Sequence, residues 1–88
     1  MYFVYVLRSL STSRHYIGFT SDLTQRLGQH NAGITKSTRN RGPWELLHQE
    51  SYEMRSEAMR RGHYLKSGQG RQELQRILAR RASAAKAG

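Results

Sequence analysis

The spacing of apolar and polar residues predicts three strands. Residues 2–7 are apolar on both faces, which is typical of a central strand covered on both sides. A polar, turn-like loop at residues 8–14 joins it to a second strand at residues 15–19. After Pro43, a third strand is expected at residues 44–52. Three strands around one apolar strand indicate a small sheet, either antiparallel or mixed.

Three helices are predicted between and after these strands. The first follows three candidate N-cap residues at positions 20–22 and ends near Gly33, a residue type that suits the position just past a helix end. The second is expected at residues 57–66, with Ser56 as its N-cap. The third begins near Arg71, where apolar residues recur at helical spacing.

Length and composition limit the class of protein. The 88 residues are enough for one domain, which we place at residues 1–82, followed by a flexible tail at residues 83–88. The chain has no cysteine, which excludes disulfides, zinc–thiolate sites and thiol nucleophiles, and its four histidines are too far apart for a local metal pair. The apolar start is too short for a signal peptide or a membrane span, so we expect a cytoplasmic protein without a membrane partner.

The chain is strongly basic. Fifteen Lys and Arg residues against six Asp and Glu give a formal net charge of +9, and most of the cations are arginine. Arginine binds phosphate with two parallel hydrogen bonds, so this excess favours a polyanionic partner, most often nucleic acid. A ribosome-associated protein and a binder of membrane surfaces are alternatives that charge alone does not separate.

The first predicted helix carries an arginine and a histidine four residues apart. Arg26 and His30 fall on one arc of this helix with Leu23 and Leu27. The leucines must face a core, so the two polar side chains lie at the edge of the buried stripe. A cation there can be partly desolvated and held in place. A solvated basic face beside an ordinary amphipathic stripe is the alternative interpretation.

The loop at residues 34–43 has no hydrophobic periodicity, and it is rich in cations and hydroxyls. Such a loop can surround phosphate with positive charges and hydroxyl donors, although a merely solvated linker has the same composition. The candidate nucleic-acid contacts from this loop and from the later helices are Lys36, Thr38, Arg39, Arg41, Lys66 and Arg71.

Five short sequence elements follow one another along the chain: Val4-Tyr5-Val6-Leu7, Tyr16-Ile17-Gly18-Phe19-Thr20, Arg26 with His30, Thr38-Arg39 with Pro43-Trp44-Glu45-Leu46, and Glu57-Ala58 with Leu65-Lys66-Ser67-Gly68. In their order and spacing they resemble the GIY-YIG nuclease domain, and in particular its small single-domain bacterial branch, the UPF0213 type. The resemblance extends from residue 2 to about residue 78. It implies an α+β fold in which helices flank a three-stranded antiparallel sheet. It also implies hydrolysis of DNA phosphodiester bonds with one divalent metal such as Mg²⁺ and no small-molecule cofactor.

The resemblance assigns catalytic roles to four residues: Tyr5 and Tyr16 take the places of the two motif tyrosines, Arg26 that of the helix arginine, and His30 that of a histidine usual in this branch. Arginine can stabilise charge that develops on phosphate oxygens. A tyrosine is a poor base unless a neighbouring cation favours its phenolate. Histidine can accept or relay a proton. Ordinary strand packing of the tyrosines and a structural histidine remain alternative interpretations.

One position departs from the family pattern. The family's metal ligand is a glutamate on the second long helix, and this chain has Gly62 there, which offers no ligand. If the resemblance holds, a carboxylate at position 62 would face the same side as Arg26 and the tyrosines. Three functions therefore remain open: a nuclease whose metal is held by another group, a nuclease fold that binds nucleic acid without cutting it, and a basic RNA-associated or ribosome-associated protein.

Overall fold

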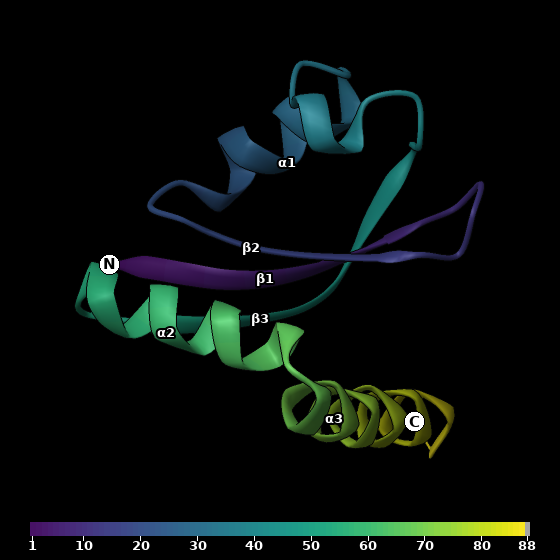
Figure 1. Ribbon diagram of the computed structural model, residues 1–88. Coiled ribbons are helices and arrows are strands. Elements are labelled where there is room, and N and C mark those ends of the chain that lie inside the picture. The colour runs from purple at the N-terminus through teal and green to yellow at the C-terminus, as the bar shows by residue number, and fades with distance from the viewer. Residues whose placement is uncertain (88) are drawn as a thin grey trace.

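The computed structural model describes residues 1–87, without the side chains of residues 37 and 83–87. It contains three strands, three α-helices and one 3₁₀ helix (Figure 1). In chain order these are β1 (Tyr2–Ser9), β2 (His15–Thr20), α1 (Leu23–Asn31), the 3₁₀ helix η1 (Lys36–Thr38), β3 (Trp44–Tyr52), α2 (Arg55–Lys66) and α3 (Gly68–Ala87).

The three strands form one antiparallel sheet in the order β2-β1-β3. The sequence prediction of a three-stranded antiparallel sheet flanked by helices is confirmed, and the apolar strand β1 is its centre. Helix α1 lies on one side of the sheet, and α2 and α3 lie on the other (Figure 1). A β-bulge between Val6 and Leu7 interrupts the pairing of β1 with β3.

Alternate residues of β1 supply two separate cores. Val4 and Val6 are completely buried with Ala58 and Leu65 of α2. Tyr5 and Leu7 point to the other face, toward Leu23 and Leu27 of α1. Successive side chains of a strand alternate between faces, which explains why an apolar run without alternation became the central strand.

The first helix begins and ends as its sequence predicts. Asp22 is the N-cap, and its carboxylate accepts a 3.0 Å hydrogen bond from the backbone N–H of Gln25. Gly33, at φ 75°, follows the C-cap residue, and its N–H donates to the carbonyl of His30. The backbone N–H of Ile34 donates to the carbonyl of Gln29, which completes a Schellman motif.

Two helix boundaries differ from the prediction. Helix α2 begins at Arg55 with Met54 as N-cap, because the Glu57 carboxylate accepts a hydrogen bond from the Met54 N–H at 3.1 Å. Helix α3 begins at Gly68 and continues to Ala87, where a tail was predicted from residue 83. Alanine has the highest helix propensity, and the C-terminal segment is rich in it. The last residue of that predicted tail, 88, lies outside the described residues.

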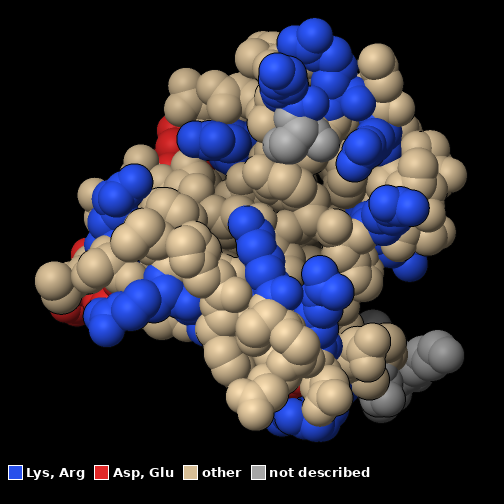
Figure 2. Space-filling model, in the orientation of Figure 1, with Lys and Arg blue, Asp and Glu red and all other residues tan. Residues whose placement is uncertain are grey.

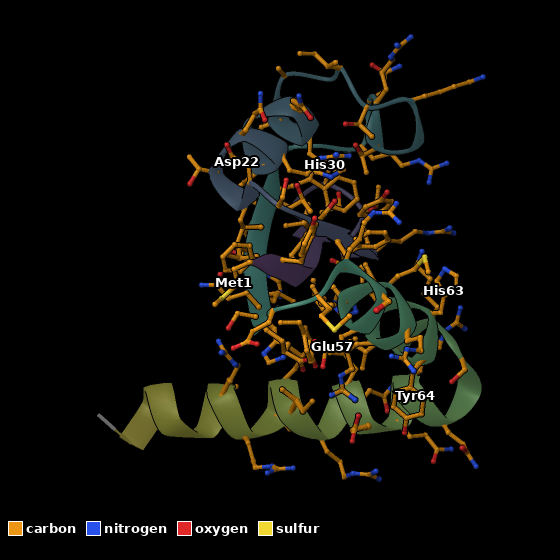
Figure 3. All side chains as sticks on the ribbon, turned by 90° about the vertical axis from the view of Figure 1, so that its left-hand side faces the viewer. Met1, Asp22, His30, Glu57, His63 and Tyr64 are labelled. Carbon is orange, nitrogen blue, oxygen red and sulfur yellow. The ribbon has the colours of Figure 1, made fainter. Side chains whose placement is uncertain are left out.

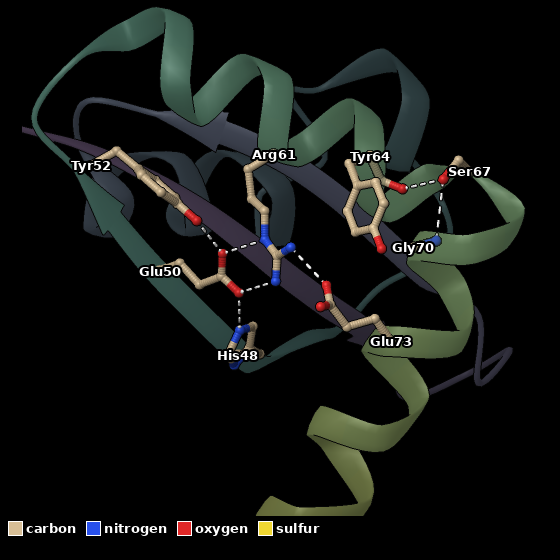
Figure 4. Close-up of polar contacts among 8 residues, drawn as sticks. All are labelled: His48, Glu50, Tyr52, Arg61, Tyr64, Ser67, Gly70 and Glu73. Atoms are coloured by element: carbon tan, nitrogen blue, oxygen red, sulfur yellow. Dashed lines mark hydrogen bonds and ion pairs between the residues drawn. The ribbon is translucent and has the colours of Figure 1, made fainter.

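A polar network joins β3 to α2 and α3 on the side of the sheet away from α1 (Figure 4). Glu50 accepts hydrogen bonds from Arg61 at 2.8 and 3.1 Å, from Tyr52 at 2.6 Å and from His48 at 2.8 Å. Arg61 also pairs with Glu73 of α3 at 2.7 Å. Burial alone would raise the pKa of Glu50, but these donors lower it to about 2. The network therefore holds both carboxylates in structural roles.

Candidate active site

Three of the four predicted catalytic side chains meet under α1. Tyr5 comes from β1, Tyr16 from β2 and His30 from α1, and the tyrosine ring centroids lie 5.7 and 5.0 Å from that of His30. The two tyrosine rings are 6.3 Å apart. Tyr5 and His30 are buried, whereas Tyr16 is half-buried. The inner part of the cluster is therefore formed by Tyr5 and His30, and Tyr16 is the tyrosine that reaches the surface.

Gly18 makes room for the ring of Tyr5. The two residues are paired across β1 and β2, and a Cβ at Gly18 would lie 2.5 Å from Tyr5 Oη and 2.7 Å from its Cζ. Contacts this short are repulsive, so any larger residue would displace the phenol. The packing of the Tyr5 ring therefore explains why the Tyr-Ile-Gly motif has glycine at position 18.

A chain of hydrogen bonds runs inward from Tyr5. Tyr5 Oη lies 3.0 Å from His30 Nε2, and His30 Nδ1 lies 2.7 Å from Thr38 Oγ1. Thr38 Oγ1 donates to the carbonyl of Thr35 at 3.4 Å, so it can accept the Nδ1–H of His30. This leaves Nε2 of a neutral imidazole as acceptor for the Tyr5 O–H. Figure 3 shows His30 on the side of α1 that faces the sheet.

The electrostatics of the cluster favour the neutral form of both inner groups. Burial, followed by repulsion from Tyr16, raises the pKa of Tyr5 to about 12, although Arg26 opposes this. Burial, followed by the positive charge of Arg26, lowers the pKa of His30. The expectation that a nearby cation would favour a tyrosine phenolate is therefore wrong for Tyr5, because burial outweighs Arg26. His30 is the better proton acceptor near neutral pH.

Arg26 contributes the positive charge of this site. Its positive charge influences the pKa values of both Tyr5 and His30, lowering each of them. The side chain is half-buried. Among the described residues it makes no ion pair with a carboxylate. A partly desolvated cation without a carboxylate partner is suited to an external anion.

Thr38 has a different place from the one that the sequence predicted. It was expected to contact nucleic acid, but its exposed fraction is 1% and its hydroxyl is bound to His30. Its carbonyl accepts the indole N–H of Trp44 at 3.3 Å, and the backbone N–H of Trp44 donates to Asn31 Oδ1 at 2.7 Å. Thr38 therefore orients His30 from inside. Only the Thr38-Arg39 motif pointed to this residue, and no residue pattern indicated its contact with His30.

The remaining predicted nucleic-acid contacts are exposed: Lys36, Arg39, Arg41, Lys66 and Arg71. The loop that carries the first three is anchored, because the buried Ser9 hydroxyl and the Ser11 hydroxyl both donate to the carbonyl of Arg41. On the face drawn in Figure 2, Lys and Arg side chains occur in every part of the surface, and acidic side chains are seen mainly near its left edge. The charge excess is thus spread over this face.

The residues present do not fit the metal that the family implies. Among the described residues, no group of three His, Asp or Glu side chains is placed to hold an ion. Gly62 is buried with Ala58 and Leu65 on α2, and a Cβ there would meet no atom within 4 Å. Glu50 and Glu73 are held by Arg61, Glu45 pairs with Arg8, and Asp22 and Glu57 bind helix N-termini.

The position of α2 also corrects the expected direction of residue 62. This helix covers the sheet face opposite Tyr5 and Tyr16, so a carboxylate there would not share their face. The sheet has free edges at β2 and at β3. The edge at β2 is the one next to Tyr16. At the β2 edge, Tyr16 and Lys66 line one cavity.

Comparisons with known proteins agree on one family. The profile of the GIY-YIG catalytic domain matches residues 1–75. A UPF0213 protein from Halobacterium salinarum is 45% identical over 67 residues, which cover 75% of this chain and 86% of that protein. One from Clostridium perfringens is 40% identical over 78 residues, covering 88% and 83%. The solution NMR structure of a UPF0213 protein from Bacillus halodurans matches with a TM-score of 0.54 and 31% identity, covering 88% of this chain and 85% of that one.

Proposed function

The chain belongs to the GIY-YIG catalytic domain family, within its UPF0213 group, and from that premise we propose that it binds DNA and hydrolyses phosphodiester bonds at the α1-side cluster. The observation that carries this proposal is the grouping of Arg26 with the hydrogen-bonded pair Tyr5 and His30. It combines a cation for a phosphate with a neutral proton acceptor. Hydrolysis of an anionic diester needs both.

The outer and inner residues have different proposed roles. Arg26 and Tyr16, which are half-buried, contact the phosphate oxygens, and the guanidinium neutralises the charge that develops during attack. Tyr5 and His30 accept the proton of the attacking water. The water proton passes to Tyr5 Oη as the Tyr5 proton passes to His30 Nε2, 3.0 Å away. The hydroxide bonds to phosphorus, the bond to the leaving oxygen breaks, and that oxygen takes a proton from solvent.

The state of His30 sets the pH range of this step. Its lowered pKa keeps the His30 imidazole neutral, and able to accept a proton, at pH values where an ordinary histidine would begin to bind one. We therefore expect cleavage to fall only below the usual histidine range, as His30 takes up a proton. The bond from His30 Nδ1 to Thr38 fixes the tautomer that this role requires.

Several wider features belong to the same proposal. The net charge of +9 supports DNA as the partner, bound partly through the exposed cations Lys36, Arg39 and Arg41. We place the catalytic unit at residues 1–82 and the protein in the cytoplasm. No helix in the described part of the chain is long and apolar enough to cross a membrane. A divalent metal such as Mg²⁺ is the cofactor that the family implies, although the residues present do not form its site.

A second function is favoured by Gly62. Because this position has no side chain, the same cluster can bind a phosphodiester without the carboxylate that the family pattern places there. The chain would then be a nucleic-acid-binding module that cuts slowly or not at all. Binding is common to both functions, so only a cleavage measurement separates them.

The test is a cleavage assay with end-labelled single-stranded and double-stranded DNA, with Mg²⁺ or with a chelator. The variants are Arg26→Ala and, as the matched control, Arg60→Ala, an exposed arginine on α2. We expect cleavage by the unaltered chain and by Arg60→Ala, and a loss of about 10²-fold or more in Arg26→Ala. Binding without cleavage would support the second function. Absence of binding at low salt would refute both.

A further inference from the structure

A cavity lies beside the candidate active site, at the free edge of the sheet. It has a volume of about 590 Å³, and Tyr16 forms part of its lining. One wall is the start of β2 and the loop before it, and the other is the corner between α2 and α3. We call this the edge groove, and its lining residues are Ser13, Arg14, His15, Tyr16, Ile17, Lys66, Arg71, Leu74, Gln75 and Leu78.

The edge groove is positively charged on both walls. Arg14 lies on the strand side, and Lys66 and Arg71 lie on the helix side. All three are exposed, none pairs with a carboxylate among the described residues, and no Asp or Glu lines the groove. Like charges that face one another repel, so three unpaired cations around one cavity are suited to an anion between them.

Both walls are held rigidly. The hydroxyl of the buried Ser9 accepts the backbone N–H of Thr12 at 3.0 Å, and the N–H of Ser9 donates to the carbonyl of Arg14 at 2.8 Å. At the other wall, a Cβ on Gly70 would lie 1.7 Å from the carbonyl oxygen of Tyr64, so only glycine permits this tight corner. The corner brings Lys66 and Arg71 to the same cavity.

The floor between the walls is apolar. Ile17 is 9% exposed and Leu74 is 4% exposed, and Leu78 packs against the same core. A small inorganic anion gains nothing from such a floor. A sugar-phosphate backbone presents both features that the groove matches, since its phosphates are anionic and the carbons of its sugars are apolar.

We propose that the edge groove binds the sugar-phosphate backbone of a nucleic acid next to the phosphate that occupies the candidate active site. Phosphates contact Arg14, Lys66 and Arg71, and the sugars lie against Ile17, Leu74 and Leu78. Tyr16 borders the groove and contacts the ring of His30, so one strand can pass from the groove to the candidate active site. This inference rests on the proposed function for the identity of the ligand, and it adds where the strand runs.

The test compares two triple variants of the full chain that carry the same charge. The groove variant is Arg14→Gln with Lys66→Gln and Arg71→Gln. The control variant is Arg60→Gln with Arg76→Gln and Arg80→Gln, three exposed cations that line no cavity described here. Each variant removes three positive charges from a net charge of +9, so a general effect of charge is the same in both.

The measurement is affinity for a fluorescent oligonucleotide as a function of salt, with circular dichroism as the check on folding. Each phosphate contact contributes roughly 0.7–0.9 to the slope of log K against log salt, so the groove variant should lose about 2–3 in slope and the control clearly less. Equal slopes in the two folded variants would overturn the proposal. If the groove variant does not fold, Arg14→Gln alone should still lower the slope of log K against log salt by the contribution of about one phosphate contact relative to Arg60→Gln.

Two further arms separate this inference from its alternatives. In an NMR titration, inorganic phosphate that shifts the Arg14, Lys66 and Arg71 signals as strongly as the oligonucleotide would make the groove a small-anion site and overturn the proposal. Arg26→Ala is measured beside the triple variants. If the unaltered chain binds and cuts DNA, and only Arg26→Ala loses binding or cleavage, the proposed function stands and the proposed role of the edge groove is refuted. If the unaltered chain does not bind, the proposed function itself fails.

Discussion

Replacing Gly18 by alanine should damage both the stability of the protein and its candidate active site. The added Cβ would lie 2.5 Å from Tyr5 Oη and 2.7 Å from Tyr5 Cζ. A phenol at the end of a mobile side chain could simply move, but Tyr5 is 2% exposed and its hydroxyl is bonded to the buried His30. Overpacking of this kind costs about 1–3 kcal/mol.

The same shift would break the 3.0 Å bond between Tyr5 and His30. Leaving a buried acceptor without a partner costs about 1–3 kcal/mol, and the two penalties overlap because one movement relieves the clash and breaks the bond. We therefore expect a total loss of about 2–3 kcal/mol. For a domain of this size, 1 kcal/mol corresponds to roughly 4–8 °C in Tm.

Urea unfolding and thermal melting measure this loss, and Gly28→Ala is the matched control. Gly28 is exposed within α1, and a Cβ there would meet no atom within 4 Å, so alanine should leave stability unchanged or raise it by up to about 1 kcal/mol. Adding Tyr5→Phe to Gly18→Ala removes the closest atom and should cost less than the sum of the single changes. Gly18→Ala as stable as Gly28→Ala would refute the packing of Tyr5 on Gly18.

Three further predictions follow from the site and its surroundings. Thr38→Val should destabilise the protein by about 1–3 kcal/mol and reduce cleavage, because His30 Nδ1 loses its partner; an equal effect of Thr35→Val, measured by the same unfolding and cleavage assays, would contradict this. Gly62→Glu should not raise Mg²⁺-dependent cleavage above that of Gly62→Gln, because α2 covers the sheet face opposite Tyr5 and Tyr16; cleavage by Gly62→Glu well above that of Gly62→Gln and of the unaltered chain at matched Mg²⁺ would contradict this placement. The folded-state pKa values of His30 and Glu50 are lowered, so the stability that each contributes is present above its unfolded-state pKa and is lost on acidification. Unfolding measured at each pH should show this loss below about pH 6.5 for His30 and between about pH 4.5 and 2 for Glu50. An unchanged loss of stability with acid in Glu50→Gln would contradict the assignment to Glu50.

Local patterns in the sequence were sufficient for the sheet and for α1. The uninterrupted apolar run of β1 identifies the central strand, and Asp22 and Gly33 mark the ends of α1 through contacts within a few residues. Pro43 likewise precedes the start of β3. These features depend on neighbours along the chain, which a sequence displays directly.

Features that depend on distant contacts were not predictable in this way. From the sequence, Thr38 is one hydroxyl residue of a predicted loop, and its hydrogen bond with His30 forms only when the chain folds. From the sequence, Arg14 is only one polar residue of a predicted turn. It lines the same cavity as Lys66 and Arg71 because α2 and α3 pack beside β2. The pKa of Tyr5 depends on burial outweighing Arg26, which no residue pattern reveals.

The most direct test of where nucleic acid binds is an NMR titration of the isotope-labelled chain with a short DNA oligonucleotide. We expect the largest shifts at Tyr16, at the Arg26 guanidinium and at Arg14 of the edge groove, with the His30 ring signals changing as the phosphate approaches. The exposed Arg60 on α2 should change little. Shifts centred on Arg60 and the outer surface of α2, with Tyr16 and Arg26 unaffected, would contradict the assignment of the active site.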